Sequence, residues 1–208
     1  MSEKKDYFAH KAHVYENNEK RVSNVQNIAD GILKNISYTK DMHILDFGSG
    51  TGLLTQEIAP YVKAITAVDM STSMNEVLRA KKEGFACDLE VLELDITKEN
   101  YSDKLNNIDG IISSMTIHHV QNTEDLLQKF YDLLNENGTI GLADLETEDG
   151  SFHKEDTGVF HFGFDKDEFL NIAKKVGFTD LKIETISVSS KPHGEYPIFL
   201  LTGKKQHS

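Results

Sequence analysis

The sequence has one cysteine and no long apolar run. A single cysteine, Cys87, excludes an intramolecular disulfide bond and any metal site that needs several cysteines. No stretch approaches the roughly 18 apolar residues of a transmembrane helix. The charged start, Met1 to Asp6, is not followed by the apolar segment of a signal peptide. We therefore expect a soluble cytoplasmic protein that does not insert into membranes.

Positive charge is scarce, because 22 lysines and arginines stand against 34 aspartates and glutamates. The formal net charge is -12. Nucleic-acid affinity rests mainly on Lys and Arg side chains that neutralise phosphates, so this balance argues against DNA or RNA as a partner. A length of 208 residues with 38% hydrophobic content is typical of one globular domain.

Hydrophobic periodicity predicts an α/β fold. Between Val22 and Ile36, apolar residues recur at steps of three and four, which indicates a helix in the polar segment 1–40. Five apolar runs of strand length follow, at residues 43–47, 64–68, 89–94, 108–114 and 139–143. Helical stretches separate several of these runs. This alternation predicts a Rossmann-like, mostly parallel sheet with helices on both faces.

Helix boundaries carry their own signals. Ser73 and Glu76 have the spacing of a capping box, and Asp165 precedes another helical stretch that Gly177 would end. We expect helices to begin at both positions.

The last thirty residues depart from the alternation. Two strands, 181–188 and 196–202, are joined by a segment too short for a crossover helix, so they should form a C-terminal antiparallel hairpin. A long irregular stretch, Glu146 to Gly163, precedes them and is of a kind that is usually functional or disordered. No linker is evident. We predict a single domain, 1–208, with an N-terminal helical cap over 1–40 and a core over 41–208.

A glycine-rich loop follows the first predicted strand. Gly48, Gly50 and Gly52 alternate between that strand and a helix beginning near Leu53, which permits a tight turn and close approach of a ligand to the backbone. A dinucleotide fingerprint would place Gly or Ala where Leu53 stands. Some forty residues also precede this strand. The spacing favours a relative of the dinucleotide site without a pyrophosphate.

Two carboxylates end the next two strands. Asp69 lies 19 positions after Gly50, where a carboxylate can accept both hydroxyls of a ribose. Asp95 ends the third strand in the same way. Because carboxyl ends of parallel strands meet at one crevice, we expect Asp69, Asp95 and the glycine loop to converge.

Four motifs together resemble class I S-adenosylmethionine-dependent methyltransferases. They are Ile44–Gly52, Val68–Ser71, Leu94–Ile96 and Ile112–Val120. The pattern is similar to the small-molecule branch that includes ubiquinone and menaquinone biosynthesis methyltransferases. It extends from about residue 20 to residue 204 and includes the terminal hairpin, which sets this fold apart from dehydrogenases.

The resemblance implies a site for S-adenosylmethionine. The implied cofactor-binding residues are Asp46, Gly48, Ser49, Gly50, Gly52, Asp69, Met70, Asp95, Ile96 and Ser114. The loop would line the methionine part, with Asp46 binding its amino group directly or through water. Asp69 would hold the ribose diol and Met70 would pack on the adenine. Asp95 would accept a hydrogen bond from the adenine amine, with Ile96 beside the ring.

The same resemblance places Ser114 where the fourth strand ends against the reactive centre. It also matches the N-terminal segment to a cap to which Tyr15 and Arg21 would contribute.

Methyl transfer from a sulfonium needs a base only when the acceptor is a poor nucleophile at neutral pH. Histidine titrates near neutrality, so His118 is the first candidate and His161 the second. Asp144 competes for the role, although its pKa would have to be raised.

The nine histidines also raise the question of a metal. His118 and His119 are adjacent and not expected to face one ion, and no H-x-x-x-H or H-E-x-x-H spacing supports a helical site. We predict no metal.

The acceptor is predicted to be a small molecule. Residues 113–116 lack the acidic or amide residue, two prolines and aromatic of adenine-amino DNA methyltransferases, and Cys87 does not match the catalytic cysteine of RNA cytosine-C5 enzymes. Two alternatives remain open: a nicotinamide-dependent oxidoreductase, and a catalytically silent S-adenosylmethionine-binding protein.

Overall fold

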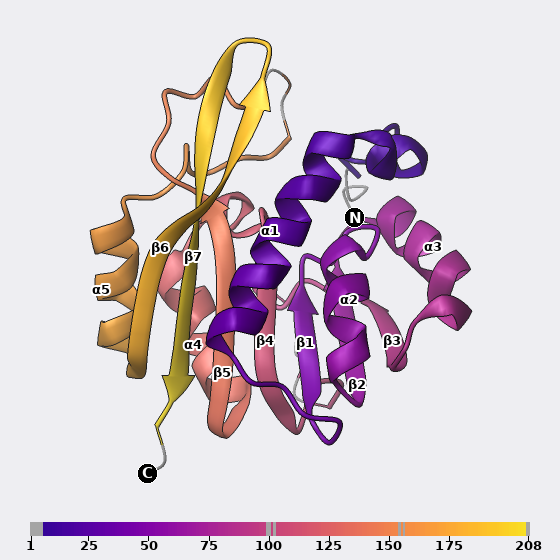
Figure 1. Ribbon diagram of the computed structural model, residues 1–208, viewed down its shortest axis with the longest axis vertical. Helices are drawn as coiled ribbons and strands as arrows, with labels where there is room; N and C mark the ends of the chain where they lie inside the picture. Colours follow the sequence, from indigo (N-terminus) through magenta and orange to yellow (C-terminus); the bar gives the residue numbers. More distant parts are fainter. Residues whose placement is uncertain (1–5, 99–100, 102, 154, 156, 207–208) are drawn as a thin grey trace.

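The computed structural model describes residues 6–98, 101, 103–153, 155 and 157–206. Seven strands form one sheet in the order β3-β2-β1-β4-β5-β7-β6 (Figure 1). They are β1 (His43–Phe47), β2 (Ala64–Asp69), β3 (Asp88–Glu93), β4 (Ile108–Ser114), β5 (Leu134–Leu145), β6 (Phe178–Lys191) and β7 (Gly194–Lys205). The first five pair in parallel. The predicted α/β fold with a mostly parallel sheet is confirmed.

The C-terminal hairpin is confirmed and is longer than predicted. Strand β7 runs antiparallel to both β5 and β6, so the hairpin closes one edge of the sheet. In Figure 1 its turn projects above the sheet, beside the segment that follows β5 and near the start of the first helix.

Helices cover both faces. They are α1 (Glu19–Asn35), α2 (Leu53–Ile58), α3 (Thr72–Lys81), α4 (Thr123–Leu133) and α5 (Lys166–Val176). Successive residues of β1 point to opposite faces of the sheet. Ile44 joins a buried cluster with α1, α2 and α3, whereas Leu45 joins a second cluster with α4 and α5. Each face of the central strands is therefore buried under its own helices.

One predicted helix start is wrong. Helix α3 begins two residues early, because Ser71 is its N-cap and its hydroxyl accepts a hydrogen bond from Met74 N. The Ser73 hydroxyl instead donates to the carboxylate of Asp6, which lies 67 residues away in the sequence. The start of α5 is confirmed: Asp165 caps it and Gly177 ends it with φ 118°.

Short 3₁₀ turns complete the chain: η1 (Ala12–Asn17), η2 (Ala59–Tyr61), η3 (Lys82–Gly84) and η4 (Ile117–His119). Among the described residues, no helix combines the length and apolar character needed to cross a membrane.

Helix α1 lies against the hairpin through Gly31. A Cβ atom at Gly31 would lie 2.7 Å from Ile186 Cδ1 of β6 and 2.9 Å from Leu200 Cδ2 of β7. Close packing there fixes α1 on the sheet, and the first turns of α1 extend toward the carboxyl ends of the parallel strands (Figure 1).

We expect Gly31→Leu to lower the free energy of unfolding by about 1–3 kcal/mol, because overpacking forces α1 away from the hairpin. The control is Asp30→Leu, which adds a leucine at an exposed position of the same helix. Urea denaturation of both variants measures the difference. Equal stability of the two variants would contradict this account of the contact.

Candidate functional site

A cavity of ≈790 Å³ lies at the carboxyl ends of the parallel strands. Its floor comes from the loops after β1, β2, β3 and β4. Its roof comes from the N-terminal segment, the start of α1, the segment after β5 and the turn of the hairpin. The predicted convergence of Asp69, Asp95 and the glycine loop at one crevice is observed.

The glycine loop needs its glycines for different reasons. All three have positive φ: 71° at Gly48, 54° at Gly50 and 88° at Gly52. A Cβ at Gly48 would lie 2.2 Å from the Thr116 side chain, and one at Gly52 would lie 2.3 Å from Leu78 Cδ1. A Cβ at Gly50 would meet no described atom within 4 Å. Gly50 therefore presents bare backbone to the cavity, whereas Gly48 and Gly52 allow close packing behind it.

Asp69 joins two loops. Its Oδ2 accepts a hydrogen bond from Gly50 N at 2.8 Å, and its Oδ1 accepts one from Ser71 N at 2.8 Å. Burial raises the pKa of Asp69 above its ordinary value, although both backbone hydrogen bonds oppose the shift. Each oxygen keeps a second lone-pair direction, so the carboxylate can still accept bonds from a ligand.

Asp46 lines the cavity from the end of β1 and is 1% exposed. Its Oδ2 accepts a hydrogen bond from Thr55 Oγ1 at 2.5 Å. Burial raises the pKa of Asp46 to about 7; the Thr55 hydrogen bond opposes this and the charge of Asp69 adds to it. A cation placed beside Asp46 would favour its ionised form.

The remaining predicted cofactor residues divide into two groups. Ser49, Met70, Asp95 and Ser114 line the cavity. Gly52 and Ile96 are not among the described lining residues, and Ile96 is fully buried in the core with α4. The placement of Ile96 beside a ligand ring is therefore wrong. Thr97 and Lys98 line the cavity after Asp95 instead, a detail that strand alternation did not indicate.

Two hydroxyls of the glycine loop lack partners. Among the described residues, Ser49 Oγ and Thr51 Oγ1 are buried side-chain atoms without a hydrogen bond. Both residues line the cavity. Because buried polar atoms are normally hydrogen-bonded, these hydroxyls indicate a polar ligand at the loop.

A carboxylate–histidine pair lies where η4 and the segment after β5 border the cavity. Asp144 Oδ1 lies 2.6 Å from His118 Nδ1, and both side chains are almost completely buried. Burial raises the pKa of Asp144, but the charge and hydrogen bonds of His118 outweigh it and leave that pKa below its ordinary value. An ionised Asp144 accepts a hydrogen bond from His118 Nδ1–H, and in the neutral form of His118 the Nε2 atom is then an acceptor.

The other candidate bases are placed differently from the prediction. Neither His161 nor Asp144 is among the described residues that line the cavity. His161 Nε2 donates to Val120 O at 2.9 Å, and its ring packs against Phe164. Asp144 orients His118 and does not face the cavity. The prediction of His161 and Asp144 as bases that face an acceptor is wrong.

Two histidines missing from the sequence-based site also line the cavity: His119 and His153. His153 Nε2 lies 3.1 Å from His118 Nε2, and His153 Nδ1 lies 3.1 Å from Thr157 Oγ1. Burial lowers the pKa of His119 to about 4 and that of His153 to about 3, and the positive charge that His118 carries in its protonated form adds to both shifts. Both are neutral at physiological pH.

The adjacent His118 and His119 are placed so that both can face one ion, contrary to expectation. The rings of His118 and His119 lie side by side on η4, with centroids 4.2 Å apart and planes inclined by 40°. Each of His118, His119 and His153 offers a ring nitrogen within 4.8 Å of the nitrogens of the other two.

The roof is tied down by the N-terminal segment. Asp6 accepts hydrogen bonds from the Ser71 hydroxyl at 2.8 Å and from the Ser73 backbone and hydroxyl. Lys11 Nζ lies 2.6 Å from Glu155 Oε2, so the N-terminal segment also contacts the segment after β5. No local pattern in the sequence indicated either contact.

The cap residues Tyr15 and Arg21 both line the cavity, as the resemblance implied. Arg21 Cζ lies 3.8 Å from the centroid of the Tyr15 ring, which holds the two side chains together.

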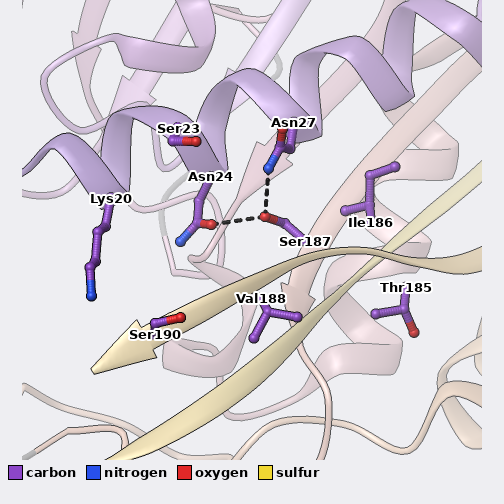
Figure 2. A pocket seen from close by; sticks show the side chains of 9 residues that line it. All are labelled: Lys20, Ser23, Asn24, Asn27, Thr185, Ile186, Ser187, Val188 and Ser190. Atoms are coloured by element: carbon purple, nitrogen blue, oxygen red, sulfur yellow. Dashed lines mark hydrogen bonds between the residues drawn. The ribbon is translucent and has the colours of Figure 1, made fainter. Parts of the chain in front are cut away.

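A polar groove of ≈460 Å³ adjoins the cavity between α1 and β6. Figure 2 shows Asn24 and Asn27 of α1 meeting Ser187 of β6, with hydrogen bonds of 2.8 and 3.0 Å at Ser187 Oγ. Lys20, Asn24 and Ser190 line both the groove and the cavity.

Comparisons with known proteins agree with this architecture. Residues 45–142 match the family model described as a methyltransferase domain. A Schizosaccharomyces pombe protein named as an uncharacterised methyltransferase is 31% identical over 156 residues, which cover 68% of this chain and 55% of that protein. The chain spans about half the length of the curated relatives it matches.

Solved structures with this fold include the following two. One is described as a methyltransferase in complex with the Haloferax volcanii Trm112 methyltransferase activator, with a TM-score of 0.79, 14% identity and coverage of 98% of this chain and 97% of that chain. The other is Haemonchus contortus phosphoethanolamine N-methyltransferase 2 with phosphomonomethylethanolamine and S-adenosylhomocysteine, with a TM-score of 0.71, 16% identity and coverage of 97% and 60%. The fold is therefore that of methyltransferases.

The raised pKa of Asp46 predicts a pH-dependent stability difference. The unfolded chain ionises Asp46 near pH 4, but the folded chain does so near pH 7, so stability falls as the pH rises through this window. We expect Asp46→Asn to be more stable than wild type by up to about 4 kcal/mol at pH 8, and the gap to close toward pH 4. Urea unfolding at several pH values measures it. A gap independent of pH would contradict the shift.

Proposed function

We propose that the protein is an S-adenosylmethionine-dependent methyltransferase that acts on a small-molecule acceptor. The observation that carries the proposal is the Asp69 carboxylate bound to Gly50 N, with the Cβ side of Gly50 open to the cavity. A nucleoside can lie against bare backbone at Gly50 while its ribose hydroxyls meet Asp69. The match of residues 45–142 to a methyltransferase domain supports the same function.

The residues present fit the cofactor. The buried, unpartnered hydroxyls of Ser49 and Thr51 suit the polar methionine end, and Asp46 suits its cationic amino group. Asp69 would hold the ribose. Met70, which is 46% exposed, would cover the adenine, and Asp95 would accept a hydrogen bond from its amine. Gly48 shapes the loop, and Ser114, which lines the cavity at the end of β4, would border the reactive centre.

The sulfonium of the bound cofactor supplies an activated methyl group. What remains for the chain is to align an acceptor with it and to exclude water. The contact of Lys11 with Glu155 joins the two roof segments over the cavity, and Phe8 packs edge-on against His119 with ring centroids 5.8 Å apart. A roof of this kind favours an enclosed, small acceptor over a macromolecule.

The net charge of -12 supports the same choice, because it opposes close approach of a nucleic-acid backbone. The quinone-like branch of the resemblance stays a prediction, as do the cytoplasmic location and the organisation of 1–208 as one domain with a helical cap.

A nicotinamide-dependent oxidoreductase is the second candidate function. The glycine loop alone would suit it, but Leu53 occupies the fingerprint's third glycine position and opens α2. A catalytically silent binding protein would share the site without turnover.

Transfer of a labelled methyl group tests the function directly. Full-length protein is incubated with methyl-labelled S-adenosylmethionine and fractionated cell metabolites, and release of S-adenosylhomocysteine is followed in parallel. Label in a metabolite fraction together with S-adenosylhomocysteine supports the proposal. Tight binding of the cofactor without either product would identify a silent binding protein.

Replacement of Asp69 should weaken cofactor binding. Asp69→Ala removes a charge-assisted acceptor worth roughly 1.5–3 kcal/mol, so the affinity for S-adenosylmethionine should fall about ten- to hundredfold. Asp109→Ala is the matched control. Asp109 accepts a hydrogen bond from His43 N at the amino ends of β1 and β4, away from the cavity. Calorimetry measures both, with circular dichroism as a check of folding. Unchanged affinity in a folded Asp69→Ala protein would refute the ribose role.

Truncation of Phe8 should affect the acceptor more than the cofactor. Phe8→Ala opens the roof beside His119, so kcat/KM for the acceptor should fall roughly tenfold while cofactor affinity changes less. Val14→Ala, at a side chain that is 56% exposed, is the control. Steady-state kinetics with the identified acceptor provide the measurement. Equal losses in the two variants would remove Phe8 from the acceptor pocket.

A further inference from the structure

We propose that His118, His119 and His153 bind a divalent transition-metal ion such as Zn²⁺, where η4 and the segment after β5 border the cavity. The three rings come from two separate segments: His118 and His119 from η4 after β4, and His153 from the segment after β5. All three line the cavity, and a ring nitrogen from each lies within 4.8 Å of the other two. Three imidazoles with an open fourth position are a donor set that zinc uses in catalytic sites.

The spacing of the nitrogens suits such an ion. Ligand nitrogens at the usual zinc distance of about 2.0–2.1 Å, in tetrahedral geometry, lie about 3.4 Å from one another. The Nε2 atoms of His118 and His153 are 3.1 Å apart. The His119 nitrogen lies within 4.8 Å of the other two, so an inward movement of at most about 1.4 Å brings it to this spacing. His119 has a weak restraint, since its Nδ1 lies 3.4 Å from Gly158 O.

Asp144, the buried partner of His118, is placed like the carboxylates that orient metal-binding histidines in other proteins. Asp144 accepts the Nδ1 proton of His118 and thereby directs the Nε2 lone pair toward the other two rings. Metal-ligating histidines almost always donate their second nitrogen to a carboxylate, a carbonyl or water. Asp144 is held in turn by the backbone amides of His118 and Leu145. This completely buried carboxylate has no position from which to contact an acceptor itself.

Without a metal, the same atoms form a chain of hydrogen bonds. When His118 is neutral and its Nδ1–H donates to Asp144, the matching directions are donation from His153 Nε2 to His118 Nε2 and from the Thr157 hydroxyl to His153 Nδ1. Metal binding needs the His153 proton on Nδ1, where it can donate to the Thr157 oxygen. The change is a tautomer shift of His153 without loss of a proton, so Thr157 serves both states.

The inference on the acceptor rests on the proposed methyltransferase function. The open coordination position would face the cavity, where it would bind the acceptor through a thiol or hydroxyl. Coordination lowers the pKa of such a group, and its proton leaves to solvent. This would provide a nucleophile without a general base. It would also assign His118 Nε2 to the metal in place of the base role that the sequence suggests.

Metal binding by the tag-free full chain tests the site independently of turnover. The protein is stripped with a chelator, titrated with Zn²⁺ or Co²⁺, and analysed by equilibrium dialysis and by the visible absorption of Co²⁺. We expect one equivalent of metal per chain and the intense visible bands of four-coordinate Co²⁺. Failure of the wild-type chain to retain stoichiometric metal at micromolar concentration would overturn the proposal.

Matched variants locate the ion. His153→Gln should weaken metal binding by at least about tenfold, as should His119→Gln, and Asp144→Asn should weaken it about ten- to hundredfold through His118. His43→Gln is the control. His43 begins β1 at the end of the strands away from the cavity, and its ring is hydrogen-bonded to the Thr66 hydroxyl there. Equal metal affinity in His153→Gln and His43→Gln would overturn the assignment even if Asp144→Asn fails to fold.

A separate measurement distinguishes failure of the site from failure of the function. S-adenosylmethionine binding is measured with and without chelator in the same preparations. Stoichiometric metal in a chain that does not bind S-adenosylmethionine would support the metal site and contradict the methyltransferase. Cofactor binding and methyl transfer at full rate in a metal-free chain would contradict activation of the acceptor by the metal and leave the methyltransferase intact.

Discussion

The carboxylate of Asp69 is the constraint on which the site depends. It accepts one backbone hydrogen bond from Gly50 and one from Ser71, so a single side chain fixes the loop after β1 against the loop after β2. The amides of Gly48 and Ser49 both donate to Val68 O, which completes the junction. Positive φ at Gly48 and Gly50 is what permits this path. The cavity floor follows from these few bonds.

Much of the fold and part of the site could be predicted because their signals are local. The bounds of β1 agree with the apolar run 43–47, and Asp165 and Gly177 mark the ends of α5. Glycines at alternate positions identify their loop without any knowledge of its neighbours. Strand ends in a parallel sheet meet at one edge, so the positions of Asp69 and Asp95 followed from topology. The direction of a side chain just beyond a strand end does not follow from topology, and Ile96 turns into the core.

The remainder depends on contacts between residues distant in sequence. Ser73 has the spacing of a capping box, yet its hydroxyl binds Asp6 and leaves the N-cap to Ser71. His153 lies in an irregular stretch whose composition says nothing of its direction, and the structure brings it to His118. Adjacent histidines looked incompatible with one ligand because a helix or strand would separate them. In η4 the two rings nevertheless lie side by side, with centroids 4.2 Å apart.

The central claim is that the junction of Gly50 and Asp69 binds S-adenosylmethionine and not a nicotinamide dinucleotide. Isothermal titration calorimetry of the full chain with each ligand tests it most directly, because neither titration requires the acceptor. We predict saturable binding of one S-adenosylmethionine per chain, displaced by S-adenosylhomocysteine, and no binding of NADH in the same concentration range. Tighter binding of NADH than of S-adenosylmethionine would contradict it.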